Sequence, residues 1–180
     1  MAQSTGAPPT TLYQFNTASN PFVFNPLGST AGHAYNAIAM NPVDNYIYGM
    51  STNGTQTVLL RIGSDGQGVN LGVVSGGGIN ANLTPWHVYN NGEIAPDGSY
   101  YVMSSAVNTS TLFRINLATL TATAIPLSQA PITADIARHN GLLYGRRDAS
   151  GQLYSINPST GAVVPVGSSS NPPVGELLAP

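Results

Sequence analysis

Apolar and polar residues alternate along the chain in short runs, and one run recurs four times. It begins with leucine, has isoleucine or phenylalanine at its fourth position, and starts at residues 12, 59, 112 and 153, that is, 47, 53 and 41 residues apart. In the last copy the alternation places Leu153 and Ser155 on one face of a strand and Tyr154 and Ile156 on the other. A repeat of about 40–50 residues built from short strands is typical of β-propeller blades. The pattern therefore predicts an all-β propeller.

The unit that follows residue 133 shows the predicted blade most clearly. Asn140 and Gly141 favour a tight type I′ hairpin turn, and residues 158–161 supply a turn before the last strand. No stretch of the sequence combines a helical period with capping residues, so helix content should be near nil. Each blade is thus predicted to be a four-stranded antiparallel sheet with both faces buried. The strands of this unit are expected at residues 134–137, 142–145, 152–156 and 162–166.

Both ends of the sequence are predicted to be parts of blades. Residues 1–11 are small and polar and are expected to form a flexible leader, so the propeller domain should span residues 12–180. The domain opens with half a blade, continues with three complete blades, and closes with one starting strand at residues 175–180. The ends could complete a four-bladed ring, or the arc could belong to a six- to eight-bladed ring. The second alternative is favoured, which predicts a homo-oligomer or a piece of a larger chain. The strands of the half blade are expected at residues 12–16 and 22–27.

Charged residues make up only 7% of the chain, against a norm of about 25%. There is no lysine, the five cationic residues are arginines, and the net charge is −2. So few cations argue against a nucleic-acid partner, because phosphate backbones are held mainly by Lys and Arg. The lack of cysteine excludes disulfide bonds and thiolate chemistry. No apolar run reaches the roughly 18–20 residues that cross a bilayer, so no membrane span is expected.

The first four residues, Met-Ala-Gln-Ser, read as an initiator methionine joined to a mature start. Together with the low charge and the many Ser, Thr and Asn residues, this start favours a secreted or cell-surface protein. A native cytosolic start is the alternative.

Two segments resemble the repeats of bacterial secreted propellers. Asn41 to Gly49 begins Asn-Pro and ends Tyr-Ile-Tyr-Gly, and Leu153 to Gly161 reads Leu-Tyr-Ser-Ile-Asn-Pro-Ser-Thr-Gly. The resemblance covers roughly residues 12–179 and is to a broad group that includes quinoprotein-like and gluconolactonase-like propellers and uncharacterised domains of bacterial surface proteins. It implies a propeller fold and a cell-surface context. The Trp docking repeats of the quinoproteins and the metal ligands of the lactonase-like enzymes are not evident, so no cofactor is expected.

A second repeat, His-x-Tyr-Asn, marks candidate binding residues. The first strand of a propeller blade lines the central channel, so both copies are expected at the same rim. Imidazoles there could bind a metal, hydrogen-bond a sugar or sense pH. Alternatively, these side chains satisfy backbone groups of tight loops. The motif occurs twice, 54 residues apart, each time just before a predicted first strand: His33, Tyr35 and Asn36, then His87, Tyr89 and Asn90.

Three further residues are candidates for ligand contact. Glu93 and Asp135 each precede Ile-Ala on a predicted first strand, so both could face the channel and act in acid–base chemistry or hold a cation. The alternative is that they cap loops or contact water. Trp86, the single tryptophan, adjoins His87 and could stack on a sugar ring, although a lone Trp more often packs between sheets.

Three functions are compatible with these features. Low charge and Asn-, Ser- and Thr-rich loops favour a non-enzymatic extracellular binding or adhesion module for a glycan or a protein. A self-assembling structural subunit joined through open blade edges would follow from the incomplete ends. A channel-centred hydrolase or lyase would follow from Glu93, Asp135 and the two histidines. The sequence itself assigns no catalytic residue and no set of metal ligands.

Overall fold

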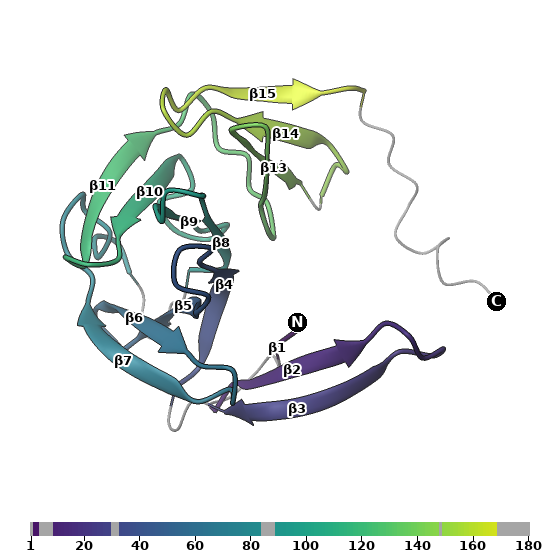
Figure 1. The fold of residues 1–180 in the computed structure, drawn as a ribbon. Coiled ribbons are helices and arrows are strands. Elements are labelled where there is room, and N and C mark those ends of the chain that lie inside the picture. The colour runs from purple at the N-terminus through teal and green to yellow at the C-terminus, as the bar shows by residue number, and fades with distance from the viewer. Residues whose placement is uncertain (1, 4–8, 30–32, 84–88, 148, 169–180) are drawn as a thin grey trace.

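The computed structural model describes residues 2–3, 9–29, 33–83, 89–147 and 149–168, and every regular element in these ranges is a β-strand. Figure 1 shows four antiparallel sheets that stand face to face around a common centre, like the blades of a propeller. They form an open arc, with a gap between the first and the last sheet. The predicted all-β fold, with three complete blades and a partial one, is confirmed. No helix that could cross a membrane occurs in the described ranges.

The first sheet is a partial blade of three strands. β1 (Ala2–Gln3) pairs with β2 (Thr11–Asn16), which pairs in turn with β3 (Val23–Ser29). β2 and β3 are the two strands predicted for the half blade, while β1 lies within the segment expected to be a leader. Thr10, in that same segment, is buried, and its side-chain oxygen accepts a hydrogen bond from the backbone N–H of Tyr35 at 3.1 Å. This bond ties the residue before β2 to the second sheet.

The other three sheets each contain four strands in the order of the sequence, each paired with the next. The second sheet contains β4 (Tyr35–Met40), β5 (Ile47–Thr52), β6 (Thr57–Ile62) and β7 (Gly68–Val73). The third contains β8 (Asn91–Ile94), β9 (Tyr100–Met103), β10 (Thr111–Asn116) and β11 (Thr121–Pro126). The fourth contains β12 (Ala137–His139), β13 (Leu142–Arg146), β14 (Leu153–Ile156) and β15 (Val163–Val166).

In the fourth sheet the first strand is shifted from its predicted place. β12 begins at Ala137, whereas the strand was expected at residues 134–137. Thr133 still forms an isolated bridge with Arg147, but the carboxylate of Asp135 accepts the N–H of Ile136 at 2.8 Å. This local bond competes with cross-strand pairing and interrupts the ladder. The starting strand predicted at residues 175–180 lies outside the described residues.

Three apolar clusters fill the spaces between neighbouring sheets, so both faces of the two middle sheets are buried. The cluster between the first and second sheets includes Leu12, Tyr35, Ile47, Val58, Leu60 and Ile62. The cluster between the second and third includes Met50, Leu59, Tyr89, Val102, Phe113 and Ile115. The cluster between the third and fourth includes Tyr101, Met103, Leu112, Leu143, Ile156 and Val163.

The recurring run forms β2, β6, β10 and β14, which we call the repeat strands. The leucine that opens each copy of the run points toward the following sheet: Leu12, Leu59 and Leu112 are all 0% exposed and lie in the first, second and third clusters, respectively. The second and fourth residues of the run point toward the preceding sheet, because successive side chains alternate. Examples of such residues are Leu60 and Ile62, then Phe113 and Ile115, and finally Ile156.

The innermost strands β4 and β8 approach each other closely at Gly92. A Cβ atom on Gly92 would lie 2.0 Å from the carbonyl oxygen of Ala37, so no larger residue fits without a shift of the backbone. The hydroxyl of Tyr100 donates a hydrogen bond to that same carbonyl oxygen. The second and third sheets are thus joined near the centre of the arc by backbone contact and by a buried hydrogen bond.

Candidate functional site

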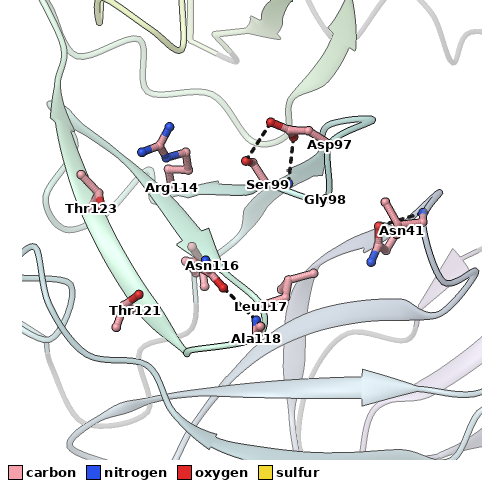
Figure 2. A pocket seen from close by; sticks show the side chains of 12 residues that line it. Asn41, Asp97, Gly98, Ser99, Arg114, Asn116, Leu117, Ala118, Thr121 and Thr123 are labelled. Carbon is pink, nitrogen blue, oxygen red and sulfur yellow. Dashed lines mark hydrogen bonds between the residues drawn. The ribbon is translucent and has the colours of Figure 1, made fainter.

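A polar pocket of about 430 Å³ lies at the rim of the second and third sheets, and we call it the rim pocket (Figure 2). Three turns contribute to it: the one before β5, the one before β9 and the one between β10 and β11. The middle sheets therefore place residues from distant parts of the sequence around one cavity. Its principal polar side chains are Asn41, Asp97, Ser99, Arg114, Asn116 and Thr123.

The rim pocket lies where the third sheet lacks an aromatic residue that the second sheet has. Arg61 and Arg114 occupy the same register position in their sheets, and Ser99 occupies the position of Tyr46. In the second sheet the guanidinium carbon of Arg61 lies 4.6 Å from the centre of the Tyr46 ring, a cation–π contact. Ser99 is too small to cover Arg114 in this way, and the side chain of Arg114 is exposed on the wall of the pocket.

Asp97 supplies the negative charge of the rim pocket. Its carboxylate accepts the backbone N–H of Ser99 at 3.0 Å and the hydroxyl of Ser99 at 3.2 Å (Figure 2). The backbone N–H of Ser99 is the main cause that holds the pKa of the Asp97 carboxyl below its usual range, and the charge of Arg114 adds to the effect. Asp97 is therefore ionised at neutral pH, in the same pocket as the guanidinium group of Arg114.

Asn116 and the hydroxyl residues complete the wall of the rim pocket. The side-chain oxygen of Asn116 accepts the N–H of Ala118 at 2.9 Å and that of Thr119 at 3.1 Å, and neither bond uses its amide nitrogen, which can donate. The hydroxyls of Ser99 and Thr123 can both donate and accept. A cation, an anion, an amide and hydroxyl groups in one cavity suit a small polar ligand rather than an apolar one.

The first His-x-Tyr-Asn motif lies at the start of β4. Nδ1 of His33 is 3.4 Å from the hydroxyl of Ser51, and the side-chain oxygen of Asn36 accepts the N–H of Ala37 at 2.8 Å. Tyr35 is buried between the first and second sheets, and burial raises its pKa to about 12. Tyr35 therefore packs the sheets together, whereas His33 and Asn36 are partly exposed at the start of β4, the end of that strand opposite to the rim pocket.

In the second copy of the motif, Tyr89 and Asn90 link neighbouring segments. Tyr89 is buried, its hydroxyl donates to the carbonyl oxygen of Ile79 at 2.7 Å, and burial raises its pKa. The amide of Asn90 donates to the carbonyl oxygen of Ala134 at 3.1 Å, which connects the third sheet to the segment before the fourth. Trp86 and His87 lie outside the described residues, so the predicted pair of histidines is not placed.

Glu93 and Asp135 interact electrostatically, although only Glu93 lies on a strand. Burial raises the pKa of Glu93, and the charge of Asp135 raises it further, while the charge and the backbone N–H of Arg138 act in the opposite direction. Partial desolvation also raises the pKa of Asp135. In the described ranges, no three His, Cys, Asp or Glu side chains are placed to hold a metal ion together.

The raised pKa of Glu93 predicts a pH-dependent gain in stability for Glu93→Gln. A carboxyl whose pKa is higher in the folded chain than in the unfolded chain stabilises the fold below the unfolded pKa, and this contribution is lost as pH rises through the folded pKa. Glutamine removes that loss, so the variant should melt above the parent protein at pH 7 and close to it at pH 4. We expect a difference below about 1 kcal/mol at pH 7, because Glu93 is partly solvated.

Thermal unfolding of both proteins at the two pH values measures this effect. Asp97→Asn is the matched control of opposite sign, because the pKa of Asp97 is lowered and its substitution should reduce stability at pH 7. A Glu93→Gln variant that melts below the parent at pH 7 would contradict the prediction.

The residues of the rim pocket were not among the sequence candidates. The signal that could have found them is a difference between two aligned turns: Asp44-Asn45-Tyr46 in the second sheet against Asp97-Gly98-Ser99 in the third. Loss of one aromatic residue between otherwise equivalent turns exposes the neighbouring arginine. That difference becomes visible only when the register of the strands aligns the two units.

Comparisons with solved structures agree with the propeller fold. The chain is similar to virginiamycin B lyase from Staphylococcus aureus, with 9% identity and a TM-score of 0.55 over 89% of this chain and 50% of that one. It is similar to Myxococcus xanthus glutaminyl cyclase, with 15% identity and a TM-score of 0.56 over 86% of this chain and 60% of that one. A third similar structure is an auxiliary nutrient binding protein from Bacteroides thetaiotaomicron, with 15% identity and a TM-score of 0.56 over 93% of this chain and 39% of that one.

The chain thus spans about half the length of these structures, and identities this low show the fold alone. No curated protein matches the chain. A family model described as a repeat of unknown function (DUF6923) matches residues 1–176, a range that contains all four repeat strands and the rim pocket.

Proposed function

The chain belongs to the DUF6923 family of repeats of unknown function, and for this member we propose the role of a non-enzymatic binding module whose rim pocket holds a sugar unit of a glycan. The observation that carries the proposal is the exposed Arg114, which Ser99 leaves uncovered where Tyr46 covers the equivalent arginine. Arg61 is stacked on an aromatic ring in the second sheet, whereas Arg114 is uncovered in the third, so only Arg114 is available to a ligand.

The chemistry of the pocket fits the hydroxyl groups of a sugar. Neighbouring hydroxyls of a pyranose both donate and accept, so they match side chains with paired hydrogen-bonding atoms such as guanidinium, carboxylate and amide groups. Arg114, Asp97 and Asn116 supply one of each. The side chain of Val43, also in the lining, offers a small apolar surface for the C–H face of a ring. A cavity of about 430 Å³ lies within the size range of small-molecule sites.

We place this module outside the cell, on a bacterial surface or in a secreted assembly. The support for this is the composition: 7% charged residues, no lysine and no cysteine, with polarity supplied by uncharged side chains. Such a surface presents few charges that would have to be desolvated when a neutral glycan binds.

The proposal predicts that Arg114→Met weakens glycan binding about 10- to 100-fold, because hydrogen bonds to a charged group contribute about 1.5–3 kcal/mol. The purified chain is first applied to an array of oligosaccharides, and the strongest ligand is then titrated by calorimetry. Arg61→Met is the matched control, since Arg61 occupies the same register position but is covered by Tyr46 and does not line the pocket.

A second variant, Ser99→Tyr, tests the same site by filling it. The introduced ring should cover Arg114 as Tyr46 covers Arg61, so it should abolish binding while the fold is retained, as monitored by circular dichroism. If the array shows no ligand, or if the two substitutions in the pocket leave binding unchanged, the glycan-binding function is wrong.

A further inference from the structure

We propose that the two outer faces of the described arc bind a second copy of this chain head to tail, so that two copies close one ring. The face of the first sheet that points away from the second is called the leading face, and the face of the fourth sheet that points away from the third is called the trailing face. The residues on each of these two faces stand at the same positions of the repeat as the residues that pack neighbouring sheets together inside the chain.

The trailing face carries a leucine whose equivalents are all buried. Leu153 opens the last repeat strand and is 37% exposed, whereas Leu12, Leu59 and Leu112 at the same position are 0% exposed against a following sheet. Val166 pairs with Leu153 and is 39% exposed. In the third sheet the residue that pairs with Leu112 is an isoleucine, and it packs into the cluster against the fourth sheet. Val164, on the same face, is 54% exposed.

The leading face carries the opposite set of positions. Tyr13 and Phe15 are the second and fourth residues of the first copy of the recurring run, the positions that elsewhere pack against a preceding sheet. Phe15 lies 6.2 Å from Phe22 and 6.0 Å from Phe24 between ring centres. Phe22 and Phe24 are 57% and 56% exposed. An aromatic group of this size on a free sheet face is unusual for a surface left in water.

The leading face is complementary to the trailing face, and neither face is complementary to a second copy of itself. Inside the chain, the leucine that opens one copy of the run packs with the second and fourth residues of the next copy, as Leu59 does in the cluster with Phe113 and Ile115. The trailing face presents the leucine side of this contact and the leading face presents the aromatic side. A contact between unlike faces is head-to-tail, and it closes when two copies are related by a twofold axis.

Charge and size are consistent with a second copy as the partner. The first 43 residues contain no Asp, Glu, Lys or Arg, so the leading face is buried without desolvating a charged side chain of its own. Two copies would contain eight sheets, twice the four of one chain. The chain spans about half the length of the propellers to which it is similar, so doubling the arc gives an assembly of comparable size.

Sedimentation velocity of the 180-residue chain across a wide range of concentration tests the proposal. The expected result is a reversible species of twice 18.6 kDa. Phe24→Glu on the leading face and Val164→Glu on the trailing face should each weaken association about 10- to 100-fold, because each buries a carboxylate in an apolar contact. Val69→Glu is the control, because Val69 is 52% exposed on β7 and belongs to neither face. The Val69→Glu variant should therefore sediment with the same mass distribution as the parent protein.

Cross-linking separates the head-to-tail contact from a contact between like faces. The chain has no cysteine, so Phe15→Cys and Leu153→Cys each introduce a single thiol. Oxidation of a mixture of the two variants should produce a disulfide-linked pair, whereas each variant alone should remain uncross-linked. Circular dichroism checks that every variant is folded. Three results would overturn the proposal: a chain that stays monomeric at all concentrations, a polymer without a dominant two-copy species, or cross-linking of either variant with itself. A monomer would mean that another segment of the same chain covers these faces or that they stay in water.

Discussion

Gly92→Ala is expected to destabilise the protein by about 3 kcal/mol or more, because the new methyl group cannot fit between β4 and β8. The added Cβ would lie 2.0 Å from the carbonyl oxygen of Ala37 and 2.6 Å from its carbonyl carbon. Both of these atoms belong to the backbone, so no side-chain rotation relieves the clash. The variant must separate the two innermost strands, and that movement also strains the hydrogen bond from Tyr100 to Ala37.

Chemical unfolding followed by far-UV circular dichroism measures this loss of stability. Gly63→Ala is a matched control, because the one close contact of its new Cβ would be the carboxylate oxygen of Asp65, at 2.9 Å, on a side chain at a turn, and the nearest backbone atom lies at 3.9 Å. Neither glycine is among the residues with a positive φ, so backbone conformation does not distinguish the two sites. A stability equal to that of the Gly63→Ala variant would show that β4 and β8 are not held this close in solution.

Phe113→Ala is the second substitution with a large expected effect, about 3–5 kcal/mol. Phe113 is 2% exposed and lies in the cluster between the second and third sheets. Its ring meets that of Tyr89 edge to face, with 5.7 Å between ring centres and an angle of 81°. The substitution removes this contact and leaves a cavity among residues of two sheets, so both sheets lose packing at once.

The matched control is Phe22→Ala, since Phe22 is 57% exposed. Measured in dilute solution, where copies of the chain are separate, it should change the free energy of unfolding by less than about 0.5 kcal/mol. Equal losses for the two phenylalanine variants would contradict the assignment of the core to the spaces between sheets.

The sheets could be predicted from the sequence because strand alternation and hairpin turns are local. Asn140 and Gly141 both have positive φ, as the predicted turn requires, and β13 and β14 follow within one residue of the expected bounds. The start of β12 could not be predicted in the same way. There the carboxylate of Asp135 bonds to the next backbone N–H, and this competition with the ladder depends on a side-chain conformation.

The candidate site was harder to predict than the fold because its residues come from several turns. Asn41 and Arg114 lie more than one repeat apart in sequence and line one cavity only after two sheets pack together. The His-x-Tyr-Asn motif, by contrast, is conspicuous in the sequence, yet Tyr35 and Tyr89 are both buried between sheets. Residues that recur in successive units thus indicate packing between sheets. A difference between units, such as Ser99 in place of Tyr46, indicates where a ligand could bind.

Every sheet is made from strands that are consecutive in the chain, and this has a consequence for synthesis on the ribosome. A strand from β2 to β15 pairs only with the strand immediately before or after it within its own sheet. A complete sheet can therefore form soon after its last strand emerges, without waiting for distant residues. Its free apolar face is then ready to receive the next sheet. The nascent chain can grow by docking one finished unit onto the last, so the apolar face of each new sheet is covered as soon as the next sheet forms.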